Sequence, residues 1–173
     1  MKLLVYYFLI ILTLISCNKK NNHFAIVVHG GAGTILKENM TPELENSYMI
    51  KLEEAVTAGY DILKNGGSSK DAVEQAIRVM EDSPLFNAGV GAVLTNDERV
   101  SLDASFMDGE NLNAGAIAGS SYIKNPISAA IAVMDKSPHV LLSSKGADDF
   151  AIETGIDTVP NSYFITERRL NSL

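Results

Sequence analysis

Residues 102–109 read LDASFMDG and residues 112–118 read LNAGAIA. Apolar side chains alternate with more polar ones from Val100 to Phe106, which is the period of a β-strand. Asp108-Gly109 follows as a turn signal that is typical of hairpins. The side chains of the returning stretch are small and apolar enough to be covered on both faces of a sheet. These residues therefore predict a β-hairpin.

Two helices are predicted upstream of this hairpin. Thr41-Pro42 is typical of an N-cap followed by proline at the first helical position, and apolar residues recur at helical spacing over 44–63. Gly66-Gly67 should end that helix. Ser68, with Asp71 three residues later, begins a second helix by the logic of the capping box. We expect the two helices to pack as an antiparallel pair.

A strand and a glycine-rich loop come before these helices. Residues 24–28 read FAIVV, a continuous β-branched run that predicts a buried strand, and residues 29–33 read HGGAG. Glycines allow backbone N–H groups to approach a ligand closely, but a tight turn without a ligand fits this motif equally well. Residues 31–36 lack the last glycine of a dinucleotide fingerprint, and the chain contains no G-x-S-x-G pentapeptide of an α/β-hydrolase.

The second half of the chain continues the α/β pattern. Asn125-Pro126 begins a predicted helix, residues 139–142 a short strand, and residues 146–154 another helix. Beyond Pro160 no period is visible. The hydrophobic content of 46% is ordinary for one globular domain, which we place over residues 24–173.

The net charge of −7 excludes one class of partner. No cluster of basic residues follows Lys19-Lys20, so the electrostatic footprint needed for nucleic-acid binding is missing. Cys17 is the only cysteine, which rules out an internal disulfide, and no pair of His or Cys residues has the spacing of a zinc site.

The first residues predict export. Lys2 precedes an uncharged apolar run over residues 3–15 that is too short to span a bilayer comfortably, so residues 1–16 are interpreted as a signal peptide. The sequence Leu-Ile-Ser-Cys that ends at Cys17 resembles the bacterial lipobox, in which the cysteine thiol takes the lipid. Residues 17–23 would then be a lipidated tether. We expect a protein anchored on the periplasmic or outer-surface side, with the lipid as its only membrane contact.

Six ordered motifs carry a resemblance to a known family. They are HGGAG (29–33), PLFNAGVGA (84–92), LDASFMDG (102–109), AGAIAG (114–119), NPISAA (125–130) and SPHV (137–140). In this order they resemble the isoaspartyl peptidase/L-asparaginase family of N-terminal-nucleophile hydrolases, from about Ala25 to Arg168. Glycosylasparaginases share the fold but do not usually begin with HGGAG, so they rank second.

The resemblance implies a fold and a reaction. The fold is an αββα sandwich, of which this chain would be the N-terminal portion. The family hydrolyses the side-chain amide of L-asparagine or β-aspartyl dipeptides. Its precursor cuts itself before a threonine, whose hydroxyl then attacks while its own amine acts as the base. The products are an α and a β subunit, which assemble as a dimer of αβ units and require no cofactor.

The nucleophilic threonine belongs to a strand downstream of SPHV in the family. Thr154, Thr158 and Thr166 precede no such strand in this sequence. The chain as given is therefore expected to be inactive, as a fragment or frameshifted copy that needs a β subunit from the same precursor. The rival hypothesis is a non-catalytic binding or scaffold lipoprotein that kept half of the fold.

The resemblance also implies site residues. Asn87 would lie near the nucleophile, although satisfying the backbone of its own loop is an equally good role for it. Gly30, Gly31 and Gly33 would lie beside the scissile region. A structural sodium ion would be held by backbone carbonyls; the corresponding positions are Met80, Glu81, Ser83, Phe86, Ala88 and Val90.

Three further polar residues favour structural roles. Asp103 and Asp108 could form a carboxylate pair for acid–base work, but a strand-edge aspartate and an Asp-Gly turn explain them better. His29 ends an apolar run, which favours a hydrogen-bonded core histidine over a base.

Overall fold

The computed structural model describes residues 23–31 and 40–173. The predicted signal peptide, Cys17 and Gly33 lie outside these ranges. The elements are α2 (Pro42–Lys64), α3 (Ser69–Glu81), the single turn η2 (Gly89–Gly91), β1 (Leu102–Met107), β2 (Ala114–Ser120), α4 (Pro126–Lys136), β3 (Leu141–Ser143), α5 (Ser144–Glu153), the turn η3 (Asn161–Phe164) and α6 (Glu167–Leu170). Within the described ranges, no helix is long and apolar enough to span a bilayer.

The predicted hairpin is confirmed. Strands β1 and β2 pair antiparallel, and β3 joins the other edge of β2 in parallel, which gives a three-stranded sheet in the order β1-β2-β3. Asp108 builds the turn, because its Oδ1 accepts the N–H of Glu110 at 2.9 Å and its backbone N–H donates to Asn113. The return strand begins at Ala114 rather than at residue 112, since Leu112 has a positive φ of 62° that takes it out of the strand.

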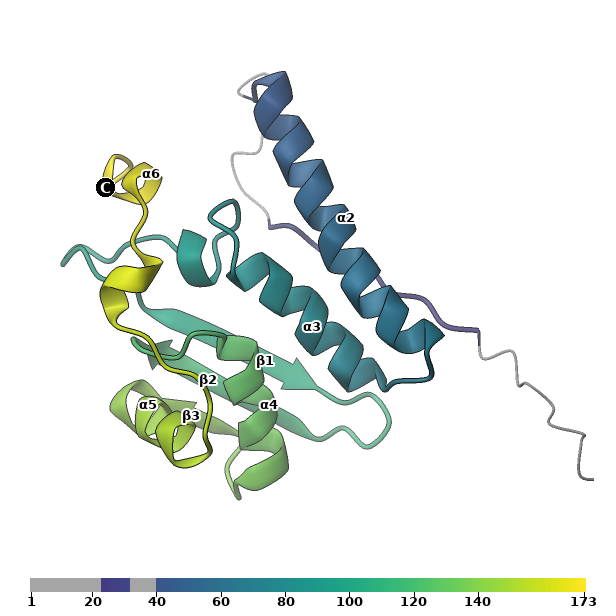
Figure 1. Cartoon of the computed structure of the whole chain (residues 1–173). Helices are drawn as coiled ribbons and strands as arrows, with labels where there is room; N and C mark the ends of the chain where they lie inside the picture. Colours follow the sequence, from purple (N-terminus) through teal and green to yellow (C-terminus); the bar gives the residue numbers. More distant parts are fainter. Residues whose placement is uncertain (1–22, 32–39) are drawn as a thin grey trace, which may run out of the picture.

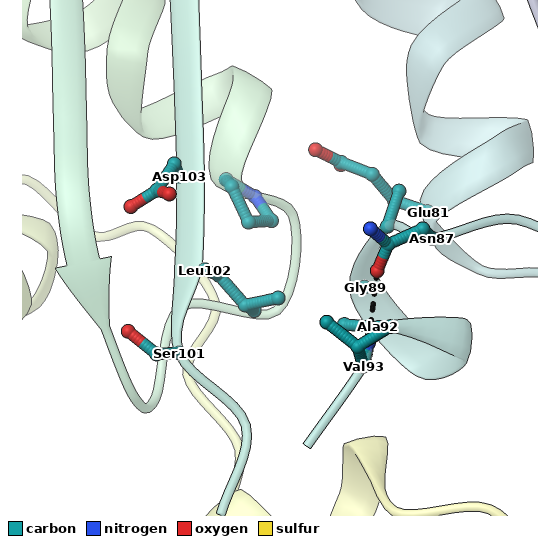
Figure 2. Close-up of a pocket in the computed structure, with 10 residues that line it drawn as sticks. Glu81, Asn87, Gly89, Ala92, Val93, Ser101, Leu102 and Asp103 are labelled. Carbon is teal, nitrogen blue, oxygen red and sulfur yellow. Dashed lines mark hydrogen bonds between the residues drawn. The ribbon is translucent and has the colours of Figure 1, made fainter. Parts of the chain in front are cut away.

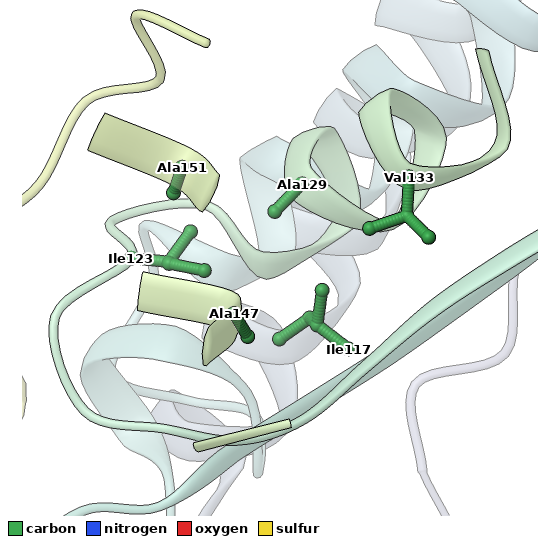
Figure 3. Close-up of a cluster of buried hydrophobic side chains, with 6 residues drawn as sticks. All are labelled: Ile117, Ile123, Ala129, Val133, Ala147 and Ala151. Carbon is green, nitrogen blue, oxygen red and sulfur yellow. The ribbon is translucent and has the colours of Figure 1, made fainter. Parts of the chain in front are cut away.

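Within residues 23–31 and 40–173, helices cover only one face of the sheet. Six buried side chains from β2, α4, α5 and the loop after β2 meet on this face (Figure 3); they are Ile117, Ile123, Ala129, Val133, Ala147 and Ala151. A Cβ on Gly115 would collide with the carbonyl of Ala130, so this glycine lets α4 lie directly on β2.

The opposite face of the sheet is open. Asp103, Ser105 and Met107 alternate along β1 with half-buried residues and are exposed on that face. The return strand β2, for which the sequence favoured cover on both faces, has only buried and half-buried residues. Both helices that contact β2 from the described part of the chain, α4 and α5, lie on the same side of it.

The two N-terminal helices form the antiparallel pair that the sequence predicts (Figure 1). Thr41 Oγ1 accepts the N–H of Leu44 at 3.2 Å, and Ser68 Oγ accepts the N–H of Asp71 at 3.1 Å. Both N-caps are thus made by the residues that the sequence indicated. Gly66, with a φ of 85°, follows the C-cap of α2 and turns the chain toward α3.

The strand predicted over residues 24–28 is absent. The segment is extended but unpaired, and it lies along α2 and α3 instead of within a sheet (Figure 1). Ile26 and Val28 are half-buried, with Ile26 against Gly59 of α2, whereas Val27 is 90% exposed. A strand needs a neighbour to accept and donate its ladder hydrogen bonds, and none lies beside this segment in the described ranges.

The C-terminal segment is ordered, although its sequence shows no period. Asn161 Nδ2 donates to the carbonyls of Val100 and Ser121 at 2.8 and 3.0 Å, and its Oδ1 accepts the N–H of Val100 at 3.1 Å. Phe164 is fully buried in a second apolar cluster with Val100 and Leu102. This segment therefore holds the residues just before β1 in place.

Candidate active site

The glycine-rich loop after α3 folds back onto the end of that helix. Gly89 has a positive φ of 47°, and a Cβ there would collide with the backbone of Glu81. A Cβ on Gly91 would collide with the carbonyl of Phe86. Only glycine fits both positions, so these residues set the course of the loop that carries Asn87.

Asn87 lies at the rim of a cavity of about 300 Å³ between this loop and β1. Its Oδ1 accepts the N–H of Val93 at 2.8 Å, and its amide nitrogen points away from that bond toward the cavity (Figure 2). The lining residues are Glu81, Asn87, Ala88, Gly89, Ala92, Val93, Ser101, Leu102, Asp103 and Pro126. Asn87 thus satisfies the backbone of its own loop through its side-chain oxygen. Its side-chain amide nitrogen, a hydrogen-bond donor, faces the cavity.

Glu81 brings a buried carboxyl group to the same cavity. Its side chain is 3% exposed, and Oε1 accepts the backbone N–H of Ile127 at 3.0 Å at the start of α4. Asn125, the N-cap of α4, makes no capping bond and donates instead to Asp82 at 3.2 Å. Glu81 therefore caps α4 from another helix, where the helix dipole favours a negative charge.

The second oxygen of this carboxyl group, Oε2, is buried without a hydrogen-bond partner. Burial raises the pKa of Glu81 to about 7, against the opposing effect of the Ile127 N–H and the Asn125 side chain. The family resemblance implied only a backbone role for this residue. The signal that could have found its side chain is its spacing, since Glu81 follows Ile77 by four residues on the apolar face of α3.

Asp103 also lines the cavity but has a structural partner. Its Oδ1 accepts the N–H of Gly119 at 2.8 Å, beside an irregularity in the register of β1 and β2. Gly119 has a φ of 66°, so the carboxylate fixes a backbone conformation that suits glycine. Asp108 lies beyond the other end of β1, in the hairpin turn. The structural roles favoured for both aspartates are confirmed, and they do not form a carboxylate pair.

The positions predicted to hold sodium run from the last two residues of α3 through the following loop into η2. The carbonyl of Met80 accepts the N–H of Ser83 at 3.1 Å, and that of Ala88 accepts the N–H of Gly91 at 3.0 Å. Ser83 is buried, and its Oγ accepts the N–H of Leu85 at 3.3 Å. Two of the six carbonyls thus accept backbone hydrogen bonds, and the ion itself stays a prediction.

Gly30 and Gly31 do not line the cavity of Asn87. They line another cavity, of about 270 Å³, with Met40, Glu45, Tyr48, Met49 and Leu52. Gly30 lies against Phe86, the residue before Asn87, because a Cβ on Gly30 would lie 3.3 Å from the Phe86 ring. Tyr48 fixes that ring by an edge contact with centroids 5.7 Å apart, and its hydroxyl donates to the carbonyl of Leu85 at 2.7 Å.

His29 is exposed, so its assignment as a core histidine was wrong. Its Nδ1 accepts the N–H of Gly31 at 3.2 Å, which closes a local turn. The physical reason is that the segment before His29 is unpaired. Because no strand lies beside it in the described ranges, the residue at the end of this apolar run is not buried. Gly31 has a φ of 112°, which explains a glycine there.

Together, the one-sided sheet, the helix pair and the glycine-rich loop with Asn87 define a mixed α/β protein of the kind expected for the N-terminal portion of an N-terminal-nucleophile hydrolase. A family model described as asparaginase matches residues 22–173, and the chain belongs to this family.

Known relatives support the assignment over most of the chain. The isoaspartyl peptidase of Salmonella typhimurium is 45% identical over 88% of this chain and 49% of its own length. The isoaspartyl peptidase of Escherichia coli is 45% identical over 86% of this chain and 46% of its own length. The plant-type L-asparaginase of Pyrococcus abyssi is 54% identical over 73% of this chain and 40% of its own length. The chain thus spans less than half the length of each of these three proteins.

Proposed function

We propose that this chain is the α portion of an amidohydrolase that cleaves the side-chain amide of L-asparagine, β-aspartyl peptides, or both. The observation that carries the proposal is 45% identity to isoaspartyl peptidases over a region that includes the loop of Asn87. The family alone supports the reaction class. The names of the relatives suggest two candidate substrates, the amino acid asparagine and a β-aspartyl peptide.

In the proposed mechanism the rest of the domain supplies the nucleophile. A threonine freed by self-cleavage attacks the amide carbonyl through its hydroxyl, and its own amine takes the proton. Asn87 of this chain would donate a hydrogen bond from its amide nitrogen near the attacking oxygen. The bond from Val93 to Asn87 Oδ1 fixes which end of the amide faces the cavity.

We also propose that this loop binds the structural sodium ion that the family resemblance implies. The carbonyl oxygens of Met80, Glu81, Ser83, Phe86, Ala88 and Val90 would hold it, and a hard cation suits such ligands. Its role would be to fix the loop that positions Asn87.

The partner of this chain would be the β portion of the same fold. Two features support this assignment: the open face of β1, and the unpaired segment over residues 24–28 with Val27 exposed. Both are surfaces that a second sheet would cover in an αββα sandwich. We propose a dimer of such αβ units as the final assembly.

The proposal can be tested by complementation. The chain is co-expressed with the C-terminal part of the Escherichia coli isoaspartyl peptidase that it does not match, and aspartate release is followed from asparagine, a β-aspartyl dipeptide and a glycosylated asparagine. We expect hydrolysis of the first or second substrate by the pair, none by the chain alone, and a loss of about a hundredfold for Asn87→Ala.

Other outcomes would overturn the proposal. Hydrolysis by the chain without a partner would refute the proposal that the rest of the domain supplies the nucleophile. Preference for the glycosylated substrate would favour a glycosylasparaginase. A stable complex that cleaves none of the three would favour the non-catalytic lipoprotein.

We further propose that Cys17 is lipidated after removal of residues 1–16, which would place the domain on the periplasmic or outer-surface side. The support is the sequence pattern of a single cysteine at the end of an apolar leader. Metabolic labelling with a fatty-acid analogue in a bacterial host should label the chain but not Cys17→Ser. Equal labelling of both would refute the anchor.

A further inference from the structure

The carbonyl of Gly91 is held from outside the glycine-rich loop. Within the loop, the N–H of Gly91 donates to Ala88 at 3.0 Å, and the N–H of Ala92 donates to Gly89 at 3.1 Å. The carbonyl of Gly91 instead accepts a hydrogen bond from Nε of Arg169 at 2.7 Å, a residue 78 positions further along the chain. Gly91 is buried, and a buried carbonyl without a partner is costly, so this bond helps to set the course of the loop.

The C-terminal segment over residues 161–170 brings Arg169 to this carbonyl (Figure 1). Phe164, in η3, is fully buried in the same apolar cluster as Ala92, the residue after Gly91. Helix α6 follows, and the Thr166 side chain caps it by accepting the N–H of Arg169 at 3.3 Å. The backbone of Arg169 is therefore fixed on both sides of η3 before its side chain reaches the loop.

The contact of Arg169 is a hydrogen bond rather than an ion pair. Arg169 is half-buried, and within residues 23–31 and 40–173 no carboxylate forms an ion pair with it. Burial, together with the adjacent charge of Arg168, lowers the pKa of Arg169, so this position does not favour the charge itself. The group that the loop uses is therefore the Nε–H donor.

The Gly91 carbonyl lies within the stretch of chain that fixes Asn87. The Asn87 side chain accepts the N–H of Val93 at 2.8 Å, so this bond closes a loop of residues 87–93 with Gly91 inside it. The same bond leaves the amide nitrogen directed at the cavity (Figure 2). A shift of the backbone at Gly91 would move Val93 relative to Asn87 and change the direction of the amide.

We propose that Arg169 is a positioning residue for Asn87, because its Nε–H holds the loop at Gly91 so that the amide nitrogen faces the cavity. The inference rests on the proposed function, in which the direction of this amide matters for hydrolysis. Arg169 does not line the cavity and acts through the loop. Its loss should therefore lower turnover more than it weakens substrate binding.

Two substitutions of Arg169 separate its donor from its charge. Arg169→Met keeps the apolar stem but has no N–H to donate. Arg169→Gln loses the charge and keeps a donor, because the amide nitrogen of glutamine is the same number of bonds from the backbone as the arginine Nε. Arg168→Met is the matched control, because it removes an equal charge from α6, and Arg168 contacts the Tyr48 hydroxyl at 3.3 Å rather than the Gly91 carbonyl.

The first measurement uses the full chain alone, kept in a non-ionic detergent, and needs no hydrolysis. Hydrogen exchange at the Val93 N–H, followed by NMR, reports whether Asn87 still accepts this bond. We expect about tenfold faster exchange in Arg169→Met, because the loop loses its outer donor, and rates within about twofold of wild type in Arg169→Gln and Arg168→Met. Circular dichroism checks that the wild type and the three variants fold alike.

The second measurement uses the chain co-expressed with the C-terminal part of the Escherichia coli isoaspartyl peptidase. Arg169→Met should lower kcat about tenfold and leave KM within about twofold, and Arg169→Gln should restore turnover. Equal Val93 exchange in the wild type and Arg169→Met would overturn the inference, and so would an unchanged kcat or an Arg169→Gln chain that behaves like Arg169→Met. If no pair hydrolyses a substrate, the proposed function fails, while the exchange rates still decide whether Arg169 holds Asn87.

Discussion

The two faces of the sheet differ in how complete they are. On the helix-covered face, Ile117 and Val133 are almost fully buried among residues of α4 and α5. On the other face, Met107 is 61% exposed and Ser105 is also exposed. The covered face has the packing of a finished core, whereas the open face and the unpaired segment over residues 24–28 have the features of an interface. The difference indicates that stability comes mainly from the covered side, and it leaves the open side for the partner proposed above.

The largest effect should come from the covered face. Ile117→Ala removes a side chain that is 1% exposed from the centre of the cluster, and we expect it to lower the free energy of unfolding by about 3–4 kcal/mol. Met107→Ala, on the open face of the same hairpin, should change it by less than about 0.5 kcal/mol. Urea unfolding of both variants tests the comparison. Similar losses would mean that the open face is already packed in the free chain.

The second effect concerns Glu81 and pH. Its pKa is raised from 4.5 in the unfolded chain to about 7 in the folded one, so the folded state binds the proton more tightly. The stabilising effect is complete below pH 4.5 and is lost as pH rises toward 7, amounting to about 3 kcal/mol from this group. Glu81→Gln should lack this part of the pH dependence. Urea unfolding between pH 4.5 and 8 in choline chloride provides the measurement, and equal slopes for both chains would contradict it.

The elements that were predicted correctly depend on local contacts, whereas the pairing of residues 24–28 depends on a distant segment. The caps at Thr41 and Ser68 and the turn at Asp108 act through neighbours a few residues away, so helices α2 and α3 and the hairpin could be found from local patterns. Residues 24–28 have the composition of a strand, but pairing depends on a second segment that a local pattern cannot supply.

The residues of the candidate site and its surroundings also differ in whether a local pattern reveals them. Asn87 was found because its loop carries a family motif. The hydrogen bond from the Ile127 N–H to the Glu81 carboxyl group was missed, because the two residues lie 46 positions apart. Asn161 was missed because one amide bonds to both backbone groups of Val100, without any repeat in the sequence. Interactions made by single residues across the chain leave no period to detect.

A third and smaller effect should follow from removing that amide. Asn161→Ala leaves the N–H and the carbonyl of Val100 without their partner, and we expect a loss of about 2 kcal/mol. Asn171→Ala, in the exposed last turn, is the control and should be nearly neutral. Urea midpoints compare the two. Hydrogen exchange at Val100 would show whether the loss is local, and unchanged protection there would refute the assigned role.

The smallest effect concerns backbone strain on the helix-covered side of the sheet. Ser144 is the first residue of α5, directly after β3, and has a φ of 48°, a conformation that costs a side chain with a Cβ roughly 1 kcal/mol. Ser144→Gly should therefore raise the free energy of unfolding by up to about 1 kcal/mol, less the entropy that glycine gains in the unfolded chain. Ser143→Gly is the matched control, because Ser143 has an ordinary extended φ of −137° and makes no capping bond, so glycine there can only destabilise. Opposite signs for the two neighbours in urea unfolding would place the strain at Ser144. A loss at both positions would show that the surrounding contacts of Ser144 outweigh its backbone conformation.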